Sequence, residues 1–363
     1  MKVVHVATFV DQGVGSADTI GGLGRFLEEI IPAQRCAGLE VTTVDVTQEA
    51  LTRVALAVTN RDWIGMRDIG WNIVGDIQAD IFHFHDWYGA VILDHLYREG
   101  HRAFVATSHL PLRRGFTYRD SGLDWHSKAV LESRCLHAVK RVTAPSQYVK
   151  KFLVQEYGLA EQIVDVIPHG VNSTEFCSST LRNAQPGSPC LLAVGRITDQ
   201  KGFELLVRAM VVVLATEPAA RLTIIGNGGA FAALAQLVVE LALENAVTLK
   251  NGMSKLALIP EYSSATLLVI PSQFEPFGLV GLEAMACGCP VLAIAPTGAE
   301  EYLVPHELTY CYTIAGLGKA ILKRIDQIRC DGGVRFGVRT RAERMTWNLA
   351  ADAYAQLYSE CVN

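Results

Sequence analysis

Several features that would place this sequence in other classes of protein are missing from it. The most apolar helical segment, 205–215, is too short to span a bilayer and contains Arg208. The first residues, Met1 to Ala7, lack the long apolar core and the small-residue cleavage site of a secretory signal peptide. We therefore expect a cytoplasmic protein.

Cysteine spacing and charge argue against two further classes. The nine cysteines are an odd number without a C-x-x-C pair, and Cys287 and Cys289 flank a single glycine, which is not a usual zinc spacing. We expect free, buried thiols in a reducing compartment. The formal net charge of -5 gives no basic excess for nucleic acid, so we expect no nucleic-acid partner.

Two motifs of cofactor and metal binding are also absent. A nicotinamide site would require G-x-G-x-x-G directly after a strand, and Gly13-Val14-Gly15 lacks the third glycine in register. The chain has no D-x-D pair, the usual carboxylate clamp for a metal–diphosphate. We therefore expect neither a cofactor nor a bound metal.

The chain instead alternates short β-branched runs with longer helical patterns. In the first half, strands are predicted at 3–9, 41–46, 80–84, 103–107, 142–144 and 164–167, with helices at 25–36, 89–99 and 146–157. In the second half, strands are predicted at 191–194, 222–225, 267–270 and 291–294, with helices at 203–216, 230–244, 279–286 and 347–361. This rhythm is typical of parallel sheets with helices on both faces.

A polar stretch at 168–189, rich in Ser, Thr, Asn, Pro and Gly, separates the two series. The 363 residues are more than one core usually holds, so we predict two domains, 1–170 and 171–346. The last helix, 347–363, is expected to cross back to the first domain. The predicted fold class is α/β, with two doubly wound, Rossmann-like domains that face a central cleft at the carboxyl ends of their strands.

Two glutamates, Glu275 and Glu283, lie on either side of a predicted turn from strand to helix. Pro276 and Gly278 shape the turn, and the helix is predicted to begin near Gly278. Its N-terminal backbone N–H groups and dipole would then face phosphate or sugar oxygens. The alternative is a capped helix with one exposed acid, and for an isolated pair of glutamates the two interpretations are equally probable.

A cationic loop, 195–202, follows the first strand of the second series. Arg196 and Lys201 lie in this loop, at the carboxyl end of a strand. A departing nucleoside diphosphate must be neutralised as the glycosidic bond breaks, and fixed cations with helix N-termini can do this without a metal. An arginine and a lysine in a loop are otherwise most often ordinary surface residues.

The first half contributes glycines and histidines. Gly21-Gly22-Leu23-Gly24 precedes the first helix, where glycine lets the backbone approach an anion closely. His83-Phe84-His85-Asp86-Trp87 ends one predicted strand, and Thr107-Ser108-His109 ends the next. A histidine at such a place can bind a sugar hydroxyl, although each taken alone is more often structural.

Taken together, these motifs resemble the retaining GT-B glycosyltransferases of family 4, which are related to the glycogen, starch and sucrose synthases. The resemblance covers nearly the whole chain in order. It rests on G-G-L-G, H-x-H-D-W, T-x-H, S-Q-Y-V-K-K-F, V-I-P-H-G-V-N, V-G-R-x(4)-K-G, E-P-F-G-L-x(3)-E and M-A-C-G-C-P-V.

The resemblance implies a role for each matching residue. Arg196 and Lys201 would hold the donor diphosphate, Glu283 the ribose hydroxyls, and Glu275 the transferred sugar. His109 would face the reaction centre. The further donor contacts that it implies are Gly22, Asp86, Gly226, Met253, Phe277, Gly278 and Leu279, with Ser254 also near the base.

The implied reaction is the transfer of a hexosyl group, most simply glucosyl from UDP or ADP, to a hydroxyl of a carbohydrate or small-molecule acceptor with retention of anomeric configuration. The leaving phosphate would assist the incoming hydroxyl. Neither the acceptor nor the oligomeric state can be read from the sequence. The region after Glu301 is shortened or divergent relative to the family, so the resemblance does not define the wall of the sugar pocket on this side.

Three alternatives remain at this stage. A nucleotide-sugar epimerase could use the same fold, although the two glutamates argue against it. A catalytically silent relative that binds sugar nucleotides is a second alternative, although four intact site residues argue against that. Membrane association is a third, because Arg113, Arg114 and Arg119 lie near Phe116 and Tyr118 and could touch lipid headgroups; an ordinary loop is the more probable interpretation.

Overall fold

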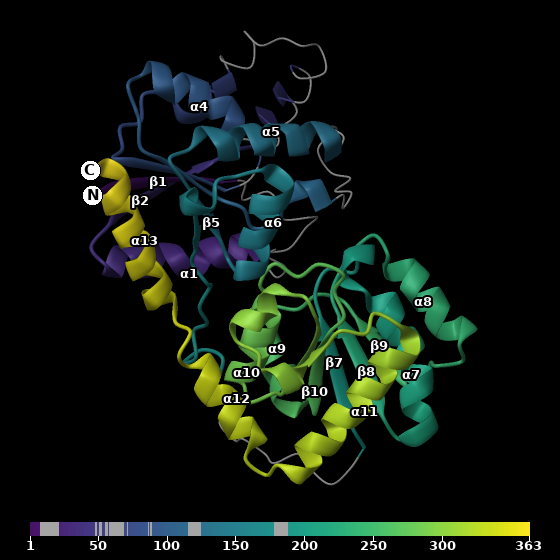
Figure 1. Cartoon of the computed structure of the whole chain (residues 1–363). Helices are drawn as coiled ribbons and strands as arrows, with labels where there is room; N and C mark the ends of the chain where they lie inside the picture. The colour runs from purple at the N-terminus through teal and green to yellow at the C-terminus, as the bar shows by residue number, and fades with distance from the viewer. Residues whose placement is uncertain are drawn as a thin grey trace. The chain divides into compact units, whose positions relative to one another are not determined.

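The chain folds into two compact α/β units in this computed structural model (Figure 1). The structure describes residues 1–7, 22–47, 49–50, 53–54, 57, 69–70, 72–85, 87, 89–114, 125–177 and 188–363. The N-terminal unit comprises Met1–Pro168 together with Trp347–Asn363, and the C-terminal unit comprises His169–Thr346. The last helix therefore belongs to the first unit, although it follows the second in sequence.

The N-terminal unit is built on a parallel six-stranded sheet. Its strands are β1 (Lys2–Ala7), β2 (Glu40–Asp45), β3 (Ile81–His85), β4 (Phe104–Thr107), β5 (Arg141–Ala144) and β6 (Val164–Val166), in the order β2-β1-β3-β4-β5-β6. The helices include α1 (Gly22–Cys36), α4 (Gly89–Arg98), α5 (Trp125–Ala138), α6 (Gln147–Tyr157) and α13 (Trp347–Val362). β3 and β4 are buried throughout, as expected of central strands covered on both faces.

Helix α13 packs against α1 in the N-terminal unit. It buries one stripe of apolar and aromatic side chains, among them Trp347, Tyr354 and Tyr358. Phe26 of α1 meets the rings of Trp347 and Tyr354 edge-on, at centroid distances of 5.9 and 6.2 Å. These contacts bring the C-terminal helix to the layer that covers β3 and β4.

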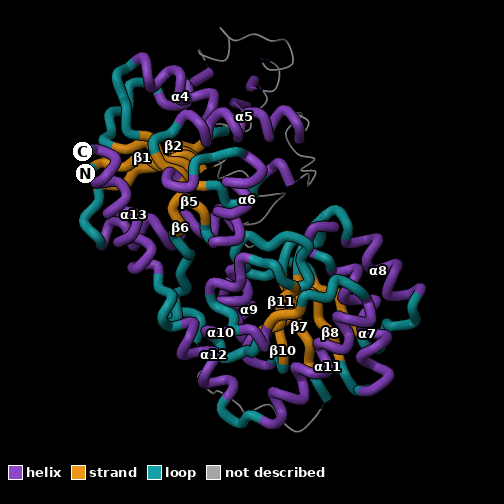
Figure 2. The backbone as a smooth tube through the Cα atoms, in the orientation of Figure 1, coloured by secondary structure: helices purple, strands orange, loops and turns teal. Residues whose placement is uncertain are grey.

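The C-terminal unit repeats the architecture. Its strands are β7 (Cys190–Val194), β8 (Arg221–Ile225), β9 (Val247–Lys250), β10 (Leu267–Ile270), β11 (Val291–Ile294) and β12 (Leu308–Thr309), in the order β12-β11-β10-β7-β8-β9. The helices are α7 (Phe203–Thr216), α8 (Phe231–Glu240), α9 (Lys255–Ser264), α10 (Leu279–Ala286), α11 (Ile314–Cys330) and α12 (Val334–Ala342). Figure 2 shows this sheet with its helices around it.

The two parallel sheets confirm the predicted fold class, with several elements added to the sequence prediction. The elements that were not predicted are β9, β12, α5, α9, α11 and α12. β9 has four residues, two of them half-buried, and α9 contains Pro260, so neither gives a strong periodic signal. The helix predicted at 230–244 ends earlier, because α8 stops at Glu240 and the turn that follows holds Ala242 at a positive φ of 53°.

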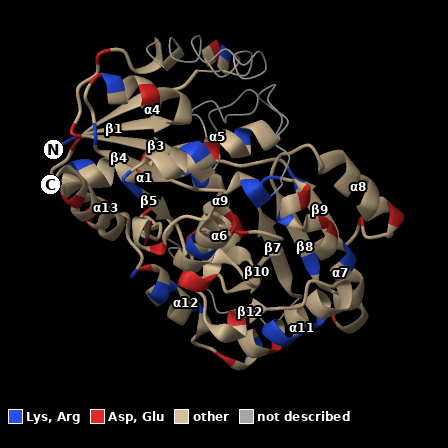
Figure 3. Ribbon diagram, turned by 45° about the horizontal axis from the view of Figure 1, so that its top comes forward, with Lys and Arg blue, Asp and Glu red and all other residues tan. Residues whose placement is uncertain are grey.

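Charged residues lie mainly on the helices and loops, while the strands are largely apolar (Figure 3). In the described part of the chain, no helix is both long and apolar enough to cross a membrane. Arg113 packs over the ring of Tyr157 at 4.8 Å and Arg114 over that of Phe152 at 5.8 Å. Phe116, Tyr118 and Arg119, the rest of the suggested membrane contact, lie outside the described residues.

Candidate functional site

The site residues of the C-terminal unit lie on loops that follow parallel strands. The loop 195–202 follows β7, Gly226 follows β8, and the turn 271–278 follows β10. Since β7 pairs with both β8 and β10, the carboxyl ends of these strands meet at one edge of the sheet. This edge is where doubly wound sheets bind ligands.

Lys201 and Glu275 are brought together at this edge. Lys201 Nζ lies 2.8 Å from Glu275 Oε2, which also accepts a hydrogen bond of 2.9 Å from Ser272 Oγ. The Glu275 side chain is 7% exposed and that of Lys201 is 20% exposed. Two residues 74 positions apart thus form an ion pair largely shielded from water.

Gln200 connects the same two loops through their backbones. Its side-chain Nε2 donates to the carbonyl of Phe274 at 2.9 Å, and its own carbonyl accepts from the N–H of Gln273 at 2.9 Å. The sequence analysis did not single out Gln200 or Ser272. Their only signal was their place next to Lys201 and Glu275 in the predicted loops.

The turn at Gly278 aims the N-terminus of α10 toward this edge. Gly278 is the N-cap residue at φ 83°, ψ 57°, a left-handed conformation that favours glycine. A Cβ at this position would lie 2.8 Å from Tyr302 Oη, which donates to the carbonyl of Gly278 at 2.6 Å. The helix begins at Leu279, as predicted, and its first N–H groups have no partner within the helix.

Glu283 lies on α10, about two turns beyond Glu275. It is 4% exposed and accepts a hydrogen bond of 3.0 Å from Tyr262 Oη of α9. Tyr262, which the sequence analysis did not identify, therefore orients this carboxylate. The alternative of an exposed acid on a capped helix does not describe Glu283.

The loops after β7 and β8 are in backbone contact. A Cβ on Gly226 would lie 1.8 Å from the carbonyl oxygen of Gly195, so only glycine fits there. The N–H of Ile197 donates to the carbonyl of Asn227 at 2.8 Å. Arg196, between these contacts, has an exposed side chain.

Met253 and Phe277 complete the predicted residues of this unit. Met253 is half-buried and packs against the core that includes Phe277. Ser254, the next residue, caps α9 by accepting from the N–H of Ala257 at 3.4 Å. Phe277 is 2% exposed, so its backbone rather than its ring is available to a ligand.

Gly22 and His109 belong to the N-terminal unit. Gly22 is the exposed first residue of α1, and His109 follows β4. His109 Nε2 lies 3.0 Å from His85 Nδ1, and the ring of Phe26 contacts it edge-on at 4.8 Å. Burial, with a smaller contribution from His5, lowers the pKa of His109 to about 3. Asp86 lies outside the described residues.

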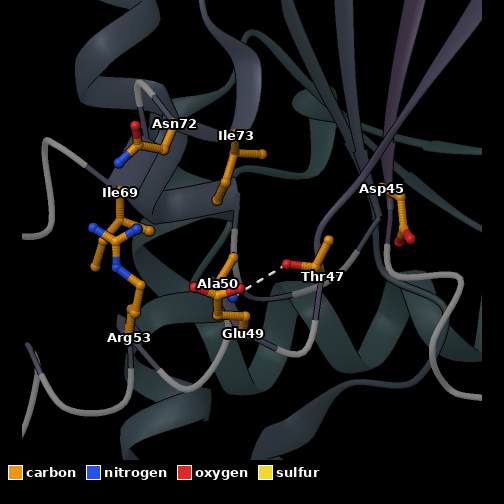
Figure 4. Close-up of a pocket in the computed structure, with 8 residues that line it drawn as sticks. All are labelled: Asp45, Thr47, Glu49, Ala50, Arg53, Ile69, Asn72 and Ile73. Atoms are coloured by element: carbon orange, nitrogen blue, oxygen red, sulfur yellow. Dashed lines mark hydrogen bonds between the residues drawn. The ribbon is translucent and has the colours of Figure 1, made fainter.

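A small polar pocket of about 200 Å³ lies beyond the carboxyl end of β2 in the N-terminal unit (Figure 4). Its lining residues are Asp45, Thr47, Glu49, Ala50, Arg53, Ile69, Asn72 and Ile73. Thr47 Oγ1 accepts from the N–H of Ala50 at 3.2 Å. The sequence analysis named none of these residues.

Two family models match the chain in succession. The model described as Glycosyltransferase Family 4 matches residues 20–175, and the one described as Glycosyl transferases group 1 matches residues 182–335. Together they span most of both units.

Curated relatives carry glycosyltransferase names. An uncharacterized glycosyltransferase of Methanocaldococcus jannaschii is 29% identical over 304 residues, which cover 79% of this chain and 76% of that protein. The D-inositol 3-phosphate glycosyltransferase of Kineococcus radiotolerans is 34% identical over 262 residues, which cover 65% of this chain and 60% of that protein. The match thus spans less than two thirds of the length of this second relative.

Solved structures of similar fold cover the whole chain. Sucrose-phosphate synthase from Thermosynechococcus elongatus superposes with a TM-score of 0.80 at 21% identity, over 99% of this chain and 98% of that one. HepE of Anabaena in complex with UDP-glucose superposes with a TM-score of 0.77 at 16% identity, over 99% and 100%. At these identities the likeness establishes the fold alone.

Proposed function

Because this chain belongs to the GT-B glycosyltransferases of the family 4 type, we propose that it transfers a hexosyl group from a nucleoside-diphosphate sugar to a hydroxyl of its acceptor. The observation that carries this proposal is the Lys201–Glu275 pair at 2.8 Å, beside the N-terminus of α10. It places a cation, a carboxylate and helix N–H groups at one edge of one sheet.

The diphosphate is held by positive charge from the protein itself. Lys201, Arg196 and the N-terminus of α10 neutralise the negative charge that grows as the sugar leaves. Lys201 and the N-terminus of α10 are held in place relative to each other, since Gln200 ties the loop of Lys201 to the turn before α10. The reaction then requires no metal ion.

The rest of the donor extends over the same edge. Glu275 and the backbone of residues 277–279 bind the transferred sugar, and Glu283, oriented by Tyr262, binds the ribose hydroxyls. Gly226 and Met253 line the place of the base. Gly22, Asp86 and His109 contribute from the N-terminal unit, with His109 at the reaction centre.

We propose a glucosyl donor with UDP or ADP as its nucleotide. In support, HepE was solved in complex with UDP-glucose, and Starch Synthase IV of Arabidopsis thaliana, which has a similar fold, was solved bound to ADP and acarbose. We propose retention of anomeric configuration, with an oxygen of the leaving phosphate receiving the proton of the attacking hydroxyl. The acceptor is a carbohydrate or another small polyhydroxylated molecule.

The first test is the release of nucleoside diphosphate from a panel of UDP-, ADP- and GDP-sugars, with and without EDTA. We expect release from UDP-glucose or ADP-glucose, at the same rate with EDTA. The coupling constant of the anomeric proton in the product then gives its configuration. Loss of activity with EDTA would contradict metal-free catalysis, and an epimerised sugar without transfer would contradict the transferase.

A further inference from the structure

Four histidine and glutamine side chains form one line of hydrogen bonds inside the N-terminal unit. Gln34 Oε1 of α1 lies 2.7 Å from His5 Nε2, and His5 Nδ1 lies 2.7 Å from His85 Nε2. His85 Nδ1 then lies 3.0 Å from His109 Nε2. Gln34, His5 and His85 are fully buried, so the line runs from the interior of the unit to the half-buried His109.

A second line of hydrogen bonds begins at the side-chain nitrogen of Gln34. Gln34 Nε2 donates to Tyr358 Oη of α13 at 3.2 Å, and Tyr358 Oη lies 2.7 Å from His83 Nδ1. His83 Nε2 lies 2.6 Å from Thr107 Oγ1, which lies 2.5 Å from Thr143 Oγ1. Gln34 is therefore the junction between two buried networks.

The three central histidines do not have the geometry of a metal site, although each can offer a nitrogen within 4.8 Å of the others. All six ring nitrogens of His5, His83 and His85 lie within 3.0 Å of a hydrogen-bonding partner. The 2.7 Å between His5 Nδ1 and His85 Nε2 is a hydrogen-bond distance. Two nitrogens on one tetrahedral zinc ion would lie about 3.3 Å apart, at Zn–N distances near 2.0 Å.

Burial keeps the rings of His5 and His83 neutral. It lowers the pKa of His5 to about 4, against a smaller opposite effect of Gln34, and it lowers the pKa of His83 well below its ordinary range. The neighbouring His5 and His109 lower the pKa of His83 further, because two protonated rings at this distance would repel each other. A neutral imidazole has one donor and one acceptor nitrogen. If one nitrogen of a ring donates a hydrogen bond, the other must therefore accept one, and this fixes which nitrogen of the next ring carries its proton.

The direction of the first line follows from Gln34. Its Oε1 only accepts, so His5 Nε2 carries the proton and His5 Nδ1 accepts from His85 Nε2–H. By the same rule His85 Nδ1 accepts from His109 Nε2–H. We propose that the buried amide of Gln34 sets the tautomer of His109 through His5 and His85, and so presents Nδ1 of His109 as a hydrogen-bond acceptor.

This tautomer gives His109 a role in binding a hydroxyl group. That role rests on the proposed function, which puts His109 at the reaction centre. An acceptor Nδ1 binds and orients a hydroxyl group that donates to it. The opposite tautomer would present an N–H and would select a carbonyl or phosphate oxygen instead. Gln34, His5 and His85 are thus positioning residues for a hydroxyl of the donor sugar or the acceptor.

The test reads the tautomers directly, by two-bond ¹H–¹⁵N correlation spectra of protein labelled with ¹⁵N-histidine. A His109→Asn spectrum identifies the signals of His109. We expect Nε2–H on His109 in the wild-type protein and in Gln34→Glu, since a carboxylate also accepts from His5. In Gln34→Met, which has similar volume but no acceptor, the Nδ1–H tautomer of His109 should appear.

Tyr358→Phe is the matched control, because it breaks the second line and keeps the bond from His5 to Gln34. His109 should keep Nε2–H in this variant. Nδ1–H on His109 in the wild-type protein, unchanged tautomers in Gln34→Met or a changed tautomer in Tyr358→Phe would each overturn the proposal. So would one equivalent of zinc bound to these histidines. If Gln34→Met does not fold, the wild-type and Gln34→Glu spectra decide.

Measurements of kcat distinguish a failure of this inference from a failure of the proposed function. If His109 binds a reacting sugar, Gln34→Met should lower kcat by about threefold to tenfold, as expected for one misdirected neutral hydrogen bond. Gln34→Glu should restore most of it. A changed tautomer with unchanged kcat supports the role of Gln34 and contradicts the place of His109 at the reaction centre.

Discussion

At the scale of single residues, Lys201 and Glu275 show how contacts within the protein hold the charges of the site in place. A lysine without a partner in this loop would adopt many rotamers, at a cost in entropy when it binds a ligand. Here Glu275, itself held by Ser272, keeps Lys201 Nζ in one position. The cation is therefore oriented before the donor arrives, which favours binding of the transition state over binding of the substrate.

Replacement of Lys201 tests its role. We expect Lys201→Ala to lower kcat by about 10²- to 10³-fold, because it removes positive charge from the developing diphosphate. Donor turnover by the folded variant is the measurement. Arg329→Ala is the control, since it removes a more exposed ion pair, with Glu217, in the same unit. Normal turnover of a folded Lys201→Ala protein would contradict the site assignment.

At the scale of elements, Glu307 joins three parts of the C-terminal unit. It is 1% exposed and accepts hydrogen bonds from Arg324 of α11 at 3.0 Å and from Arg341 of α12 at 2.6 Å. It also accepts from the N–H of Val304 at 3.1 Å. The divergent region after Glu301 thus orders α11 and α12, and its Tyr302 supports the turn at Gly278.

We expect Glu307→Gln to destabilise this unit by roughly 3–5 kcal/mol, because it leaves two arginines without their buried counter-ion. Urea unfolding followed by circular dichroism measures the change. Arg329→Ala removes the ion pair with Glu217, in which the arginine side chain is 42% exposed. This change should lower the free energy of unfolding by less than about 1 kcal/mol. Equal losses for the two variants would mean that the buried triad contributes no more than a surface pair.

At the scale of the whole molecule, three buried histidines are expected to make the stability of the N-terminal unit sensitive to acid. The neutral His5, His83 and His109 all belong to the N-terminal unit. Their pKa values are lowered by folding, so the unfolded chain binds more protons than the folded one below pH 6.5. The stability that they contribute is complete above the unfolded pKa of about 6.5 and is lost as the pH falls from there through the lowered folded values, about 4 for His5 and about 3 for His109.

We expect the titration of His5 alone to lower the free energy of unfolding of the N-terminal unit by about 2 kcal/mol when the pH falls from 7 to 5. Tryptophan fluorescence isolates this unit, because all five tryptophans of the chain lie in it. Denaturant unfolding at the two pH values measures the difference. His5→Gln keeps a polar side chain without a titrating ring, and its pH dependence should be smaller by that amount; an unchanged dependence would contradict the prediction.

The sequence by itself determined the alternation of strands and helices, the two parallel sheets and the turn at Gly278, because these follow from local periodicity and turn residues. Weak local signals hid β9 and α9. Only the tertiary structure decided which side chains meet. It paired Lys201 with Glu275 over 74 residues, and Gln34 with Tyr358 over 324. Such pairs depend on how strands are ordered in a sheet and where the last helix packs, which no local pattern encodes.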